Sequence, residues 1–317
     1  MWLNAANRDM LRLYNLRTGT MVFQRELDPI QKDASGRDHA EGDEGDEGDE
    51  GDSYGIAGVG AGDNMKAMAA WSNGTVRVWV LPAGEELLEF KTQATVEDAV
   101  MSGDGAIIVT SNADSYVVSD STSGARLCGE EGLQNVAGIA CTRDGKTVAV
   151  AKASGGVLLV AVPKGTTTLF PIKTKQVVLA VALEGGRLAV SLTDGTVAVH
   201  DVQSKKQVLT YTHPGQVESV ALSVDGWCAS ASGGDKSDRR IHLHGIAKGK
   251  RQLLVGHGSD INSVMFHPGL GECVLSASHD GSVRLWQSHA ALQQLPDRHQ
   301  HHDAVDFVEV TQHFAVR

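Results

Sequence analysis

The sequence lacks most of the features that mark membrane, helical or disulfide-rich proteins. Of its 317 residues, only 5% are aromatic, 7 are proline and 4 are cysteine. The longest aliphatic run, Val177 to Leu183, has seven residues, whereas a membrane-spanning helix needs roughly 20. No basic stretch followed by an apolar one stands at the start, so no secretory signal is expected. Helical periodicity is almost absent, which favours an all-β fold.

The small number of cysteines excludes a disulfide framework. Positions 128, 141, 228 and 273 match no zinc-binding spacing. We expect small buried thiols in a reducing compartment, which predicts a cytoplasmic or nuclear location, or both. A hydrophobic content of 41% is enough for one large core, so the chain is expected to form a single domain over residues 1–317.

A repeat of fixed period runs along almost the whole chain. Its clearest copy, SASHDGSVRLW at residues 276–286, has alternating apolar residues on both sides of a His-Asp-Gly turn, which predicts a β-hairpin. Positions equivalent to its final residue recur at spacings of 65, 41, 41, 39, 44 and 42. These anchor positions are Tyr14, Trp79, Asp120, Ala161, His200, His244 and Trp286. A period near 40 to 45 residues is typical of four-stranded propeller blades.

The two ends of the chain together supply one further repeat. Thirty-one residues follow Trp286 and 14 lead to Tyr14, a total of 45. We therefore expect a seven-bladed β-propeller of four-stranded antiparallel blades, closed by pairing of Trp2–Leu27 with Val305–Val310. Closure would remove exposed strand edges. Four turn dipeptides mark hairpins between first and second strands: Asp104-Gly105, Asp144-Gly145, Gly185-Gly186 and Asp225-Gly226.

The pattern resembles the WD40-repeat family of β-propellers, strongly over residues 213–286 and weakly over 95–175. In that family a His, a Ser, an Asp and a Trp form a hydrogen-bonded set within a blade. The resemblance implies such a structural set here, formed by His257, Ser276 or Ser278, Asp280 and Trp286. A buried indole or imidazole N–H needs a partner, because leaving it without one costs a few kcal/mol. No Trp-Asp dipeptide occurs, so the other blades are expected to be divergent.

Charge is concentrated in one short segment. The net charge is −11, and residues 38–52 hold nine acidic and no basic residues, which leaves about −2 for the rest. We expect residues 28–54 to be a disordered acidic insertion in a top-face loop, because such a composition cannot form a core. Six of its acids are Asp43, Glu44, Asp46, Glu47, Asp49 and Glu50. Two interpretations stay open: a solvated insertion without a partner, or a flexible segment that attracts a basic protein or polybasic segment.

No catalytic or metal-binding motif is present. The sequence has no Gly-x-Ser-x-Gly and no His-Glu-x-x-His, so we expect no enzyme and no cofactor. His299, His301 and His302 lie close together, but their spacing suits no defined metal site, and a solvated turn is favoured.

The family resemblance implies a non-catalytic protein-protein interaction scaffold, a monomeric subunit of a larger hetero-complex that binds neither membrane nor nucleic acid. We define the top face as the face that carries the loops from a fourth strand to the next first strand and from a second to a third strand. Candidate partner-binding residues on it are Glu97, Asp98, Gln216, Glu218, Asp260 and Asn262. Two alternatives remain. One is a Sec12-like guanine-nucleotide exchange factor for a small GTPase, which residues 75–82 and 88–98 resemble; the other is a propeller-based enzyme.

Overall fold

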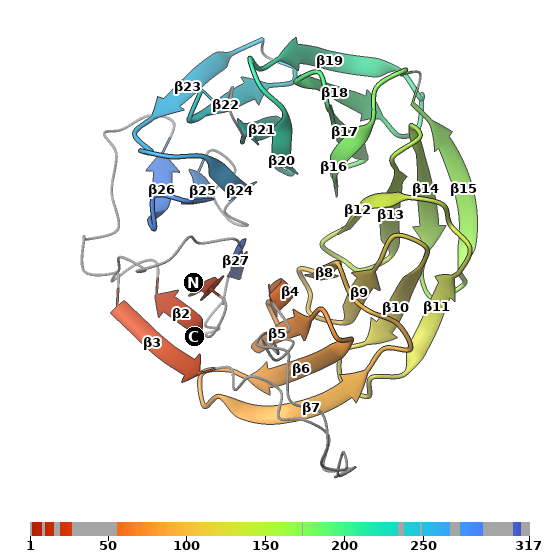
Figure 1. Ribbon diagram of the computed structural model, residues 1–317, viewed down its shortest axis with the longest axis vertical. Helices are drawn as coiled ribbons and strands as arrows, with labels where there is room; N and C mark the ends of the chain where they lie inside the picture. Colours follow the sequence, from red (N-terminus) through yellow and green to blue (C-terminus); the bar gives the residue numbers. More distant parts are fainter. Residues whose placement is uncertain are drawn as a thin grey trace, which may run out of the picture.

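The computed structural model is a ring of antiparallel β-sheets around a central channel (Figure 1). It describes residues 56–172, 174–233, 238–247, 249–266 and 273–287, together with the backbone of strands at 2–7, 10–15, 20–26 and 307–311. Over these residues the regular elements are strands, and none of them forms a helix long and apolar enough to cross a membrane.

Six sheets follow one another along the chain, and in each of them consecutive strands pair. The first two are β4 to β7, at Ile56–Gly62, Lys66–Trp71, Thr75–Val80 and Glu85–Lys91, and β8 to β11, at Asp98–Met101, Ile107–Ser111, Tyr116–Asp120 and Arg126–Glu130. The next two are β12 to β15, at Val136–Cys141, Thr147–Lys152, Gly156–Ala161 and Thr166–Pro171, and β16 to β19, at Val178–Glu184, Arg187–Leu192, Thr196–Asp201 and Gln207–Thr212. The last two are β20 to β23, at Val217–Leu222, Trp227–Ser232, Arg240–Gly245 and Arg251–Val255, and β24 to β26, at Ile261–Phe266, Cys273–Ser278 and Val283–Gln287.

A further sheet joins the two ends of the chain. Its strand order is β27, β1, β2, β3, with bounds Phe307–Thr311, Trp2–Asn7, Met10–Asn15 and Thr20–Glu26. Strand β27 pairs antiparallel with β1, with Thr311 opposite Trp2 and Phe307 opposite Ala6. This is the pairing that the 45-residue sum predicts, although β27 begins two residues later than Val305. Figure 1 shows β27 at the inner edge of the ring, beside β1.

Of the seven four-stranded blades that the sequence predicts, six are confirmed. Six sheets have four strands, and the sheet β24 to β26 has three in the part of the chain that the structure describes. A fourth strand of this sheet was expected after Gln287, where residues 288–306 lie outside the described residues. The acidic segment at 28–54 lies outside them as well. The structure therefore shows an all-β propeller with four-stranded antiparallel blades.

The repeat positions fall where the sequence period places them. All seven anchor positions lie in the third strand of their sheets, β2, β6, β10, β14, β18, β22 and β26. The predicted turn dipeptides join first strands to second strands. Gly105, Gly145, Gly185 and Gly226 in these turns have φ between 56° and 85°, a region that glycine enters without strain. The predicted hairpins are confirmed.

The core lies between neighbouring sheets. The first strand of each sheet contacts the first strand of the next, from β4 to β8 and onward to β24, β27 and back to β4. Second strands are the most buried, and every residue of β21 and β25 is buried. Fourth strands such as β7 and β19 are mostly exposed. A polar side chain on a second strand therefore needs a partner inside the protein.

Candidate functional site

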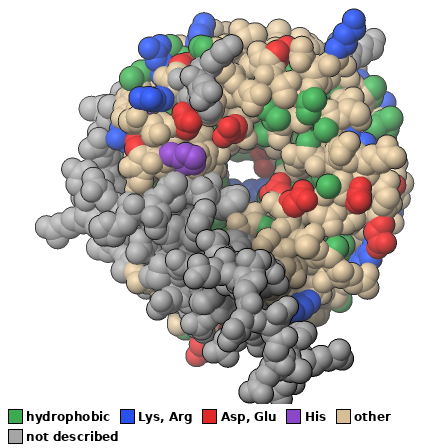
Figure 2. All heavy atoms as spheres, viewed as in Figure 1, with side chains coloured by type: hydrophobic (Ala, Val, Ile, Leu, Met, Phe, Trp, Pro, Cys, Tyr) green, Lys and Arg blue, Asp and Glu red, His purple; other side chains and the backbone are tan. Residues whose placement is uncertain are grey.

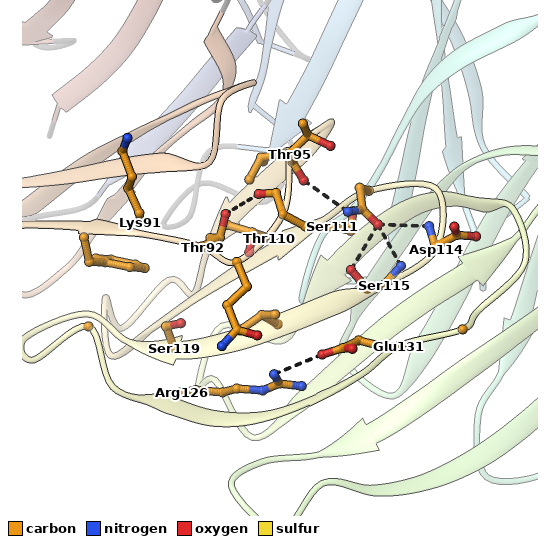
Figure 3. A pocket seen from close by; sticks show the side chains of 18 residues that line it. Lys91, Thr92, Thr95, Thr110, Ser111, Asp114, Ser115, Ser119, Arg126 and Glu131 are labelled. Atoms are coloured by element: carbon orange, nitrogen blue, oxygen red, sulfur yellow. Dashed lines mark hydrogen bonds and ion pairs between the residues drawn. The ribbon is translucent and has the colours of Figure 1, made fainter. Parts of the chain in front are cut away.

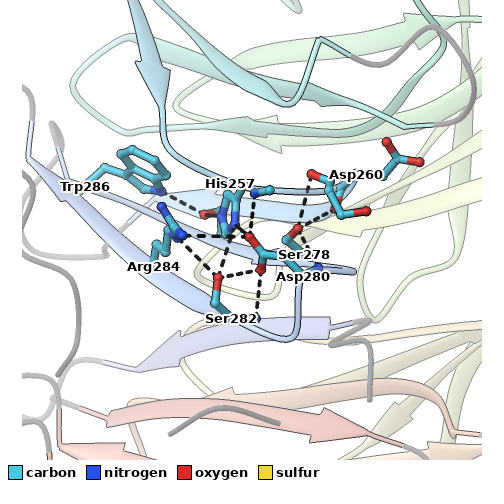
Figure 4. Close-up of polar contacts among 10 residues, drawn as sticks. His257, Asp260, Ser278, Asp280, Ser282, Arg284 and Trp286 are labelled. Atoms are coloured by element: carbon cyan, nitrogen blue, oxygen red, sulfur yellow. Dashed lines mark hydrogen bonds and ion pairs between the residues drawn. The ribbon is translucent and has the colours of Figure 1, made fainter. Parts of the chain in front are cut away.

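The sheet β24 to β26 contains a closed set of buried polar side chains (Figure 4). His257, in the loop before β24, approaches Ser276 Oγ through Nε2 at 2.7 Å and Asp280 Oδ2 through Nδ1 at 2.9 Å. Trp286 donates from Nε1 to Ser276 Oγ at 2.8 Å. His257, Ser276 and Trp286 are all buried. Every ring nitrogen of the set thus has a partner.

The acidic member of this set is held as a carboxylate. Asp280 also accepts from the backbone N–H of Gly258 at 2.8 Å and from the hydroxyl of Ser282 at 2.5 Å. Burial alone would raise the pKa of Asp280, but these donors and His257 outweigh burial and hold it well below its usual range. The pKa of His257 is lowered by burial, although Asp280 opposes that effect. The neutral imidazole and the carboxylate are therefore the stable pair.

The fifth residue expected in this structural set has a different role. Ser278 donates to the carbonyl oxygen of Asp260 at 2.7 Å and accepts from the N–H of Asp280 at 3.1 Å. It therefore ties the loop before β24 to the turn after β25. Ser276, not Ser278, contacts the histidine and the tryptophan.

A family model covers this sheet. The model, described as WD domain, G-beta repeat, matches residues 249–287, which span β23 to β26 and contain the whole polar set. This match and the ring of four-stranded sheets together support a WD40-repeat β-propeller. No curated protein matches the chain.

The preceding blade of this WD40 protein, β20 to β23, has the same framework with different contacts. Its anchor, His244, pairs with Cys228 as Trp286 pairs with Val274. Ser230 stands two residues beyond Cys228 and contacts His213 Nε2 at 2.8 Å. Here, however, Asp238 contacts His242 Nε2 at 2.8 Å instead of the histidine before the first strand.

This blade has no tryptophan at the position of Trp286, and two pairs of stacked rings lie there instead. His213 stacks on His242 with ring centroids 3.7 Å apart, and Tyr211 stacks on His244 at the same separation. The Tyr211 hydroxyl lies 2.8 Å from Ser230 Oγ, so this oxygen is already occupied and His244 Nε2 has no partner among the described residues. Sequence analysis named His244 only as an anchor and missed the cluster. The signal was present, because His213 precedes Val217 by four residues just as His257 precedes Ile261.

Serine at this second-strand position is restricted to these two blades. In the blade of Trp79 this position is Ala69, and in the blade of His200 it is Val190. As a result, Trp79 Nε1 and His200 Nδ1 are buried without a partner in the described part of the chain. Where another residue replaces the serine of the family pattern, a buried ring nitrogen of the anchor thus lacks a partner in the described structure.

The candidate partner-binding residues gather where first strands begin. Glu97, Gln216 and Glu218 are exposed, whereas Asp260 and Asn262 are partly buried. Burial raises the pKa of Glu218, the negative charge of Asp260 raises it further, and His279 opposes both. Figure 2 shows carboxylates beside the opening of the central channel.

Asp98 differs from the other candidates because it faces the channel wall. It accepts from the backbone N–H of Ile139, in the neighbouring first strand, at 3.3 Å. Burial raises its pKa to about 6, although backbone donors oppose the shift. It therefore links two blades instead of presenting a free charge to a partner.

The central channel contains a cavity of about 330 Å³ that is lined mainly by apolar side chains of the first strands. Its ionisable members are Asp98, Cys141 and Glu184. Residues 75–82 and 88–98, which resemble the exchange factor, form β6, β7 and the start of β8 and are explained by the blade pattern. None of the four cysteines forms a disulfide.

A second hollow lies between the blades β4 to β7 and β8 to β11 (Figure 3). Its volume is about 550 Å³, and six of the 18 residues that line it are Ser or Thr; Lys91, Asp114, Arg126 and Glu131 are its charged members. Arg126 pairs with Glu131 at 3.3 Å, and Asn112 binds its own turn through Ser115 and Asp114. These polar groups are used within the protein, so the hollow presents no convergent reactive set.

Proposed function

We propose that the protein is a non-catalytic scaffold that binds a basic protein segment at the acidic top face. The WD40 fold supports an interaction role, because propellers of this family hold partners on loops carried by a rigid ring. Seven blades are part of the proposal, supported by six four-stranded sheets and one three-stranded sheet that contact one another in a circle. The free thiols support a reducing location in cytosol or nucleus.

The observation that carries the proposal is a pair of neighbouring carboxylates at the start of β20 and β24. Burial raises the pKa of Glu218, and the negative charge of Asp260 raises it further. A lysine or arginine placed between them would relieve this repulsion and favour both carboxylates. Among the described residues, neither Glu97 nor Glu218 forms an ion pair with Lys or Arg. These charges are therefore free to meet a partner.

The turns on the opposite face are different. Asp63 pairs there with Arg143, and Asp144 pairs with Lys146. A basic partner would have to displace the side chains of Arg143 and Lys146 from these carboxylates before it could bind there. The contrast favours the top face as the binding surface for a cation.

The acidic insertion strengthens the same proposal through its place in the chain. Residues 27–55 connect β3 to β4, which is a connection from a fourth strand to a first strand. The connection from β7 to β8, which carries Glu97, is of the same kind. The proposal therefore places Asp43, Glu44, Asp46, Glu47, Asp49 and Glu50 above the top face, where they add long-range attraction for the partner.

Charge removal on two faces tests the proposal. We expect the double variant Glu97→Gln, Glu218→Gln to bind a fluorescent oligolysine peptide about 2- to 10-fold more weakly than wild type at low salt, because two exposed charges contribute on the order of 1 kcal/mol. The measurement is fluorescence anisotropy at low and high ionic strength. The matched control is Glu85→Gln, Glu86→Gln, which removes the same charge from exposed positions on the outer strand β7.

The control variant distinguishes binding at the proposed surface from a general effect of the protein's net charge. Equal weakening in both double variants would reduce the effect to net charge and overturn the proposed surface. Failure of the wild type to bind the peptide at low salt would overturn the basic partner itself.

A further inference from the structure

The histidine cluster of the blade β20 to β23 is a group of metal-ligating side chains with no assigned role. Sequence analysis predicted no metal site, and the only histidine group that it weighed, at 299–302, lies outside the described residues. His213, Asp238 and His242 come together from the loop before β20, the turn after β21 and strand β22. Their potential ligand atoms lie within 4.8 Å of one another. Both histidines are buried, with 5% and 4% of their surface exposed.

Both imidazoles have one satisfied and one unsatisfied nitrogen. His242 Nε2 lies 2.8 Å from Asp238 Oδ2 and, because a carboxylate only accepts, carries the proton in this structure; a cation shared with Asp238 would replace that proton. His213 Nε2 contacts Ser230. Nδ1 of both rings is buried without a partner among the described residues. A buried nitrogen without a partner is costly, and a cation would satisfy it.

We propose that His213, His242 and Asp238 bind one divalent transition-metal ion of the zinc class. Two ligands of a tetrahedral Zn²⁺ lie about 3.4 Å apart, so side-chain rotations that separate the two stacked rings bring the three groups into range. Two nitrogens and one carboxylate leave a position for water or for a partner side chain. In the last blade, Asp280 and Arg284 occupy the corresponding positions, and the Arg284 guanidinium lies 3.8 Å from Asp280. Among the described residues, His213, Asp238 and His242 form the one group of His, Cys, Asp or Glu side chains whose potential ligand atoms lie this close together.

Zinc titration of the untagged full-length protein tests the proposal. The background variant His299→Ala, His301→Ala, His302→Ala removes a competing cluster and is expected to bind one Zn²⁺ per chain in calorimetry. In that background, His242→Gln and Asp238→Asn are each expected to weaken binding at least about tenfold, as loss of a ligand does. His244→Gln is the matched control, because His244 stacks on Tyr211 and lies outside the three-residue group.

A spectroscopic measurement on folded wild-type protein guards against variants that fail to fold. The zinc X-ray absorption spectrum should show nitrogen and oxygen neighbours at about 2.0–2.2 Å, with the multiple scattering of imidazole. Absence of stoichiometric zinc binding in the background variant would overturn the proposal. So would binding that survives both His242→Gln and Asp238→Asn, or a spectrum dominated by sulfur.

Discussion

The last two blades of the propeller use one backbone framework for two polar arrangements. In β24 to β26, Ser276 joins His257 and Trp286, and Asp280 completes the set. In β20 to β23, Ser230 occupies the place of Ser276, but the third-strand anchor is His244. The first arrangement satisfies every ring nitrogen, whereas the second leaves three imidazole nitrogens without partners among the described residues.

The two blades differ both in the aromatic anchor and in the histidine that the acid contacts. Trp286 donates to its serine and leaves His257 free to reach Asp280. Where His244 replaces the tryptophan, Tyr211 takes its place beside the serine, and the acid turns to His242. One blade gains a closed structural network, and the other keeps open nitrogen lone pairs. Stability and binding capacity are thus divided between neighbouring blades.

The largest expected difference is in the free energy of unfolding, between variants of the two anchor residues Trp286 and His244. Trp286→Ala should lower the free energy of unfolding by about 3–5 kcal/mol, because it removes a large buried side chain and the donor to Ser276. His244→Ala should cost about 1–2 kcal/mol, since its ring is smaller and its Nε2 has no partner in the described structure. Urea denaturation measures both values. Equal losses would contradict the distinction between the two blades.

The acid of the closed set provides the next test. Asp280→Ala should cost about 1–3 kcal/mol, because His257 and the N–H of Gly258 lose their acceptor. Asp194→Ala is the matched control: Asp194 accepts from Thr196 at 2.9 Å in the equivalent turn, just as Asp280 accepts from Ser282, but it is exposed and has no histidine partner in the described residues. The control should change stability by no more than about 0.5 kcal/mol. An unchanged melting temperature for Asp280→Ala would refute the structural role of the set.

The pH dependence of stability gives a smaller effect. The folded-state pKa of His257 lies below its unfolded value because of burial, so only the unfolded chain takes up this proton as the pH first falls. Stability is therefore full above the unfolded pKa near 6.5 and declines as the pH drops below it, by at most about 1.4 kcal/mol per pH unit for this group. His257→Gln should make the decline between pH 6.5 and 5 shallower. The exposed His279→Gln should not change it.

The smallest effect on stability is expected outside both blades. Deletion of Asp38 to Asp52 should change the free energy of unfolding by less than about 0.5 kcal/mol, because a charged segment of this composition buries no core. It should weaken capture of a basic peptide, and the loss should shrink with added salt because exposed charges are screened. Thermal melts and pull-downs at two salt concentrations measure the two effects. A marked loss of stability would make the segment structural, and unchanged capture at low salt would make it a solvated insertion.

Much of the ring could be predicted because propeller blades repeat their turns and anchors. Gly105 and Gly145 mark tight hairpins in any context, since few other residues accept a positive φ there. Trp286 and Asp280 could be assigned to one set because their spacing follows that of a known repeat. Asp98 was harder, because its sequence neighbour Glu97 is exposed while Asp98 itself reaches Ile139 across a blade boundary.

By itself, the sequence determined the all-β ring, the position of the third strands and the join between β1 and β27. These features depend on local alternation, on turn residues and on a constant period of about 40 residues, all of which can be recognised along the chain. The tertiary structure alone decided which side chains meet between blades. Tyr211 belongs to the outer strand of one blade and yet contacts Ser230 of the next, and Asp238 contacts His242 instead of His213. Hydrogen bonding between blades depends on side-chain direction and competition for one oxygen, and neither is written in the spacing of residues along the chain.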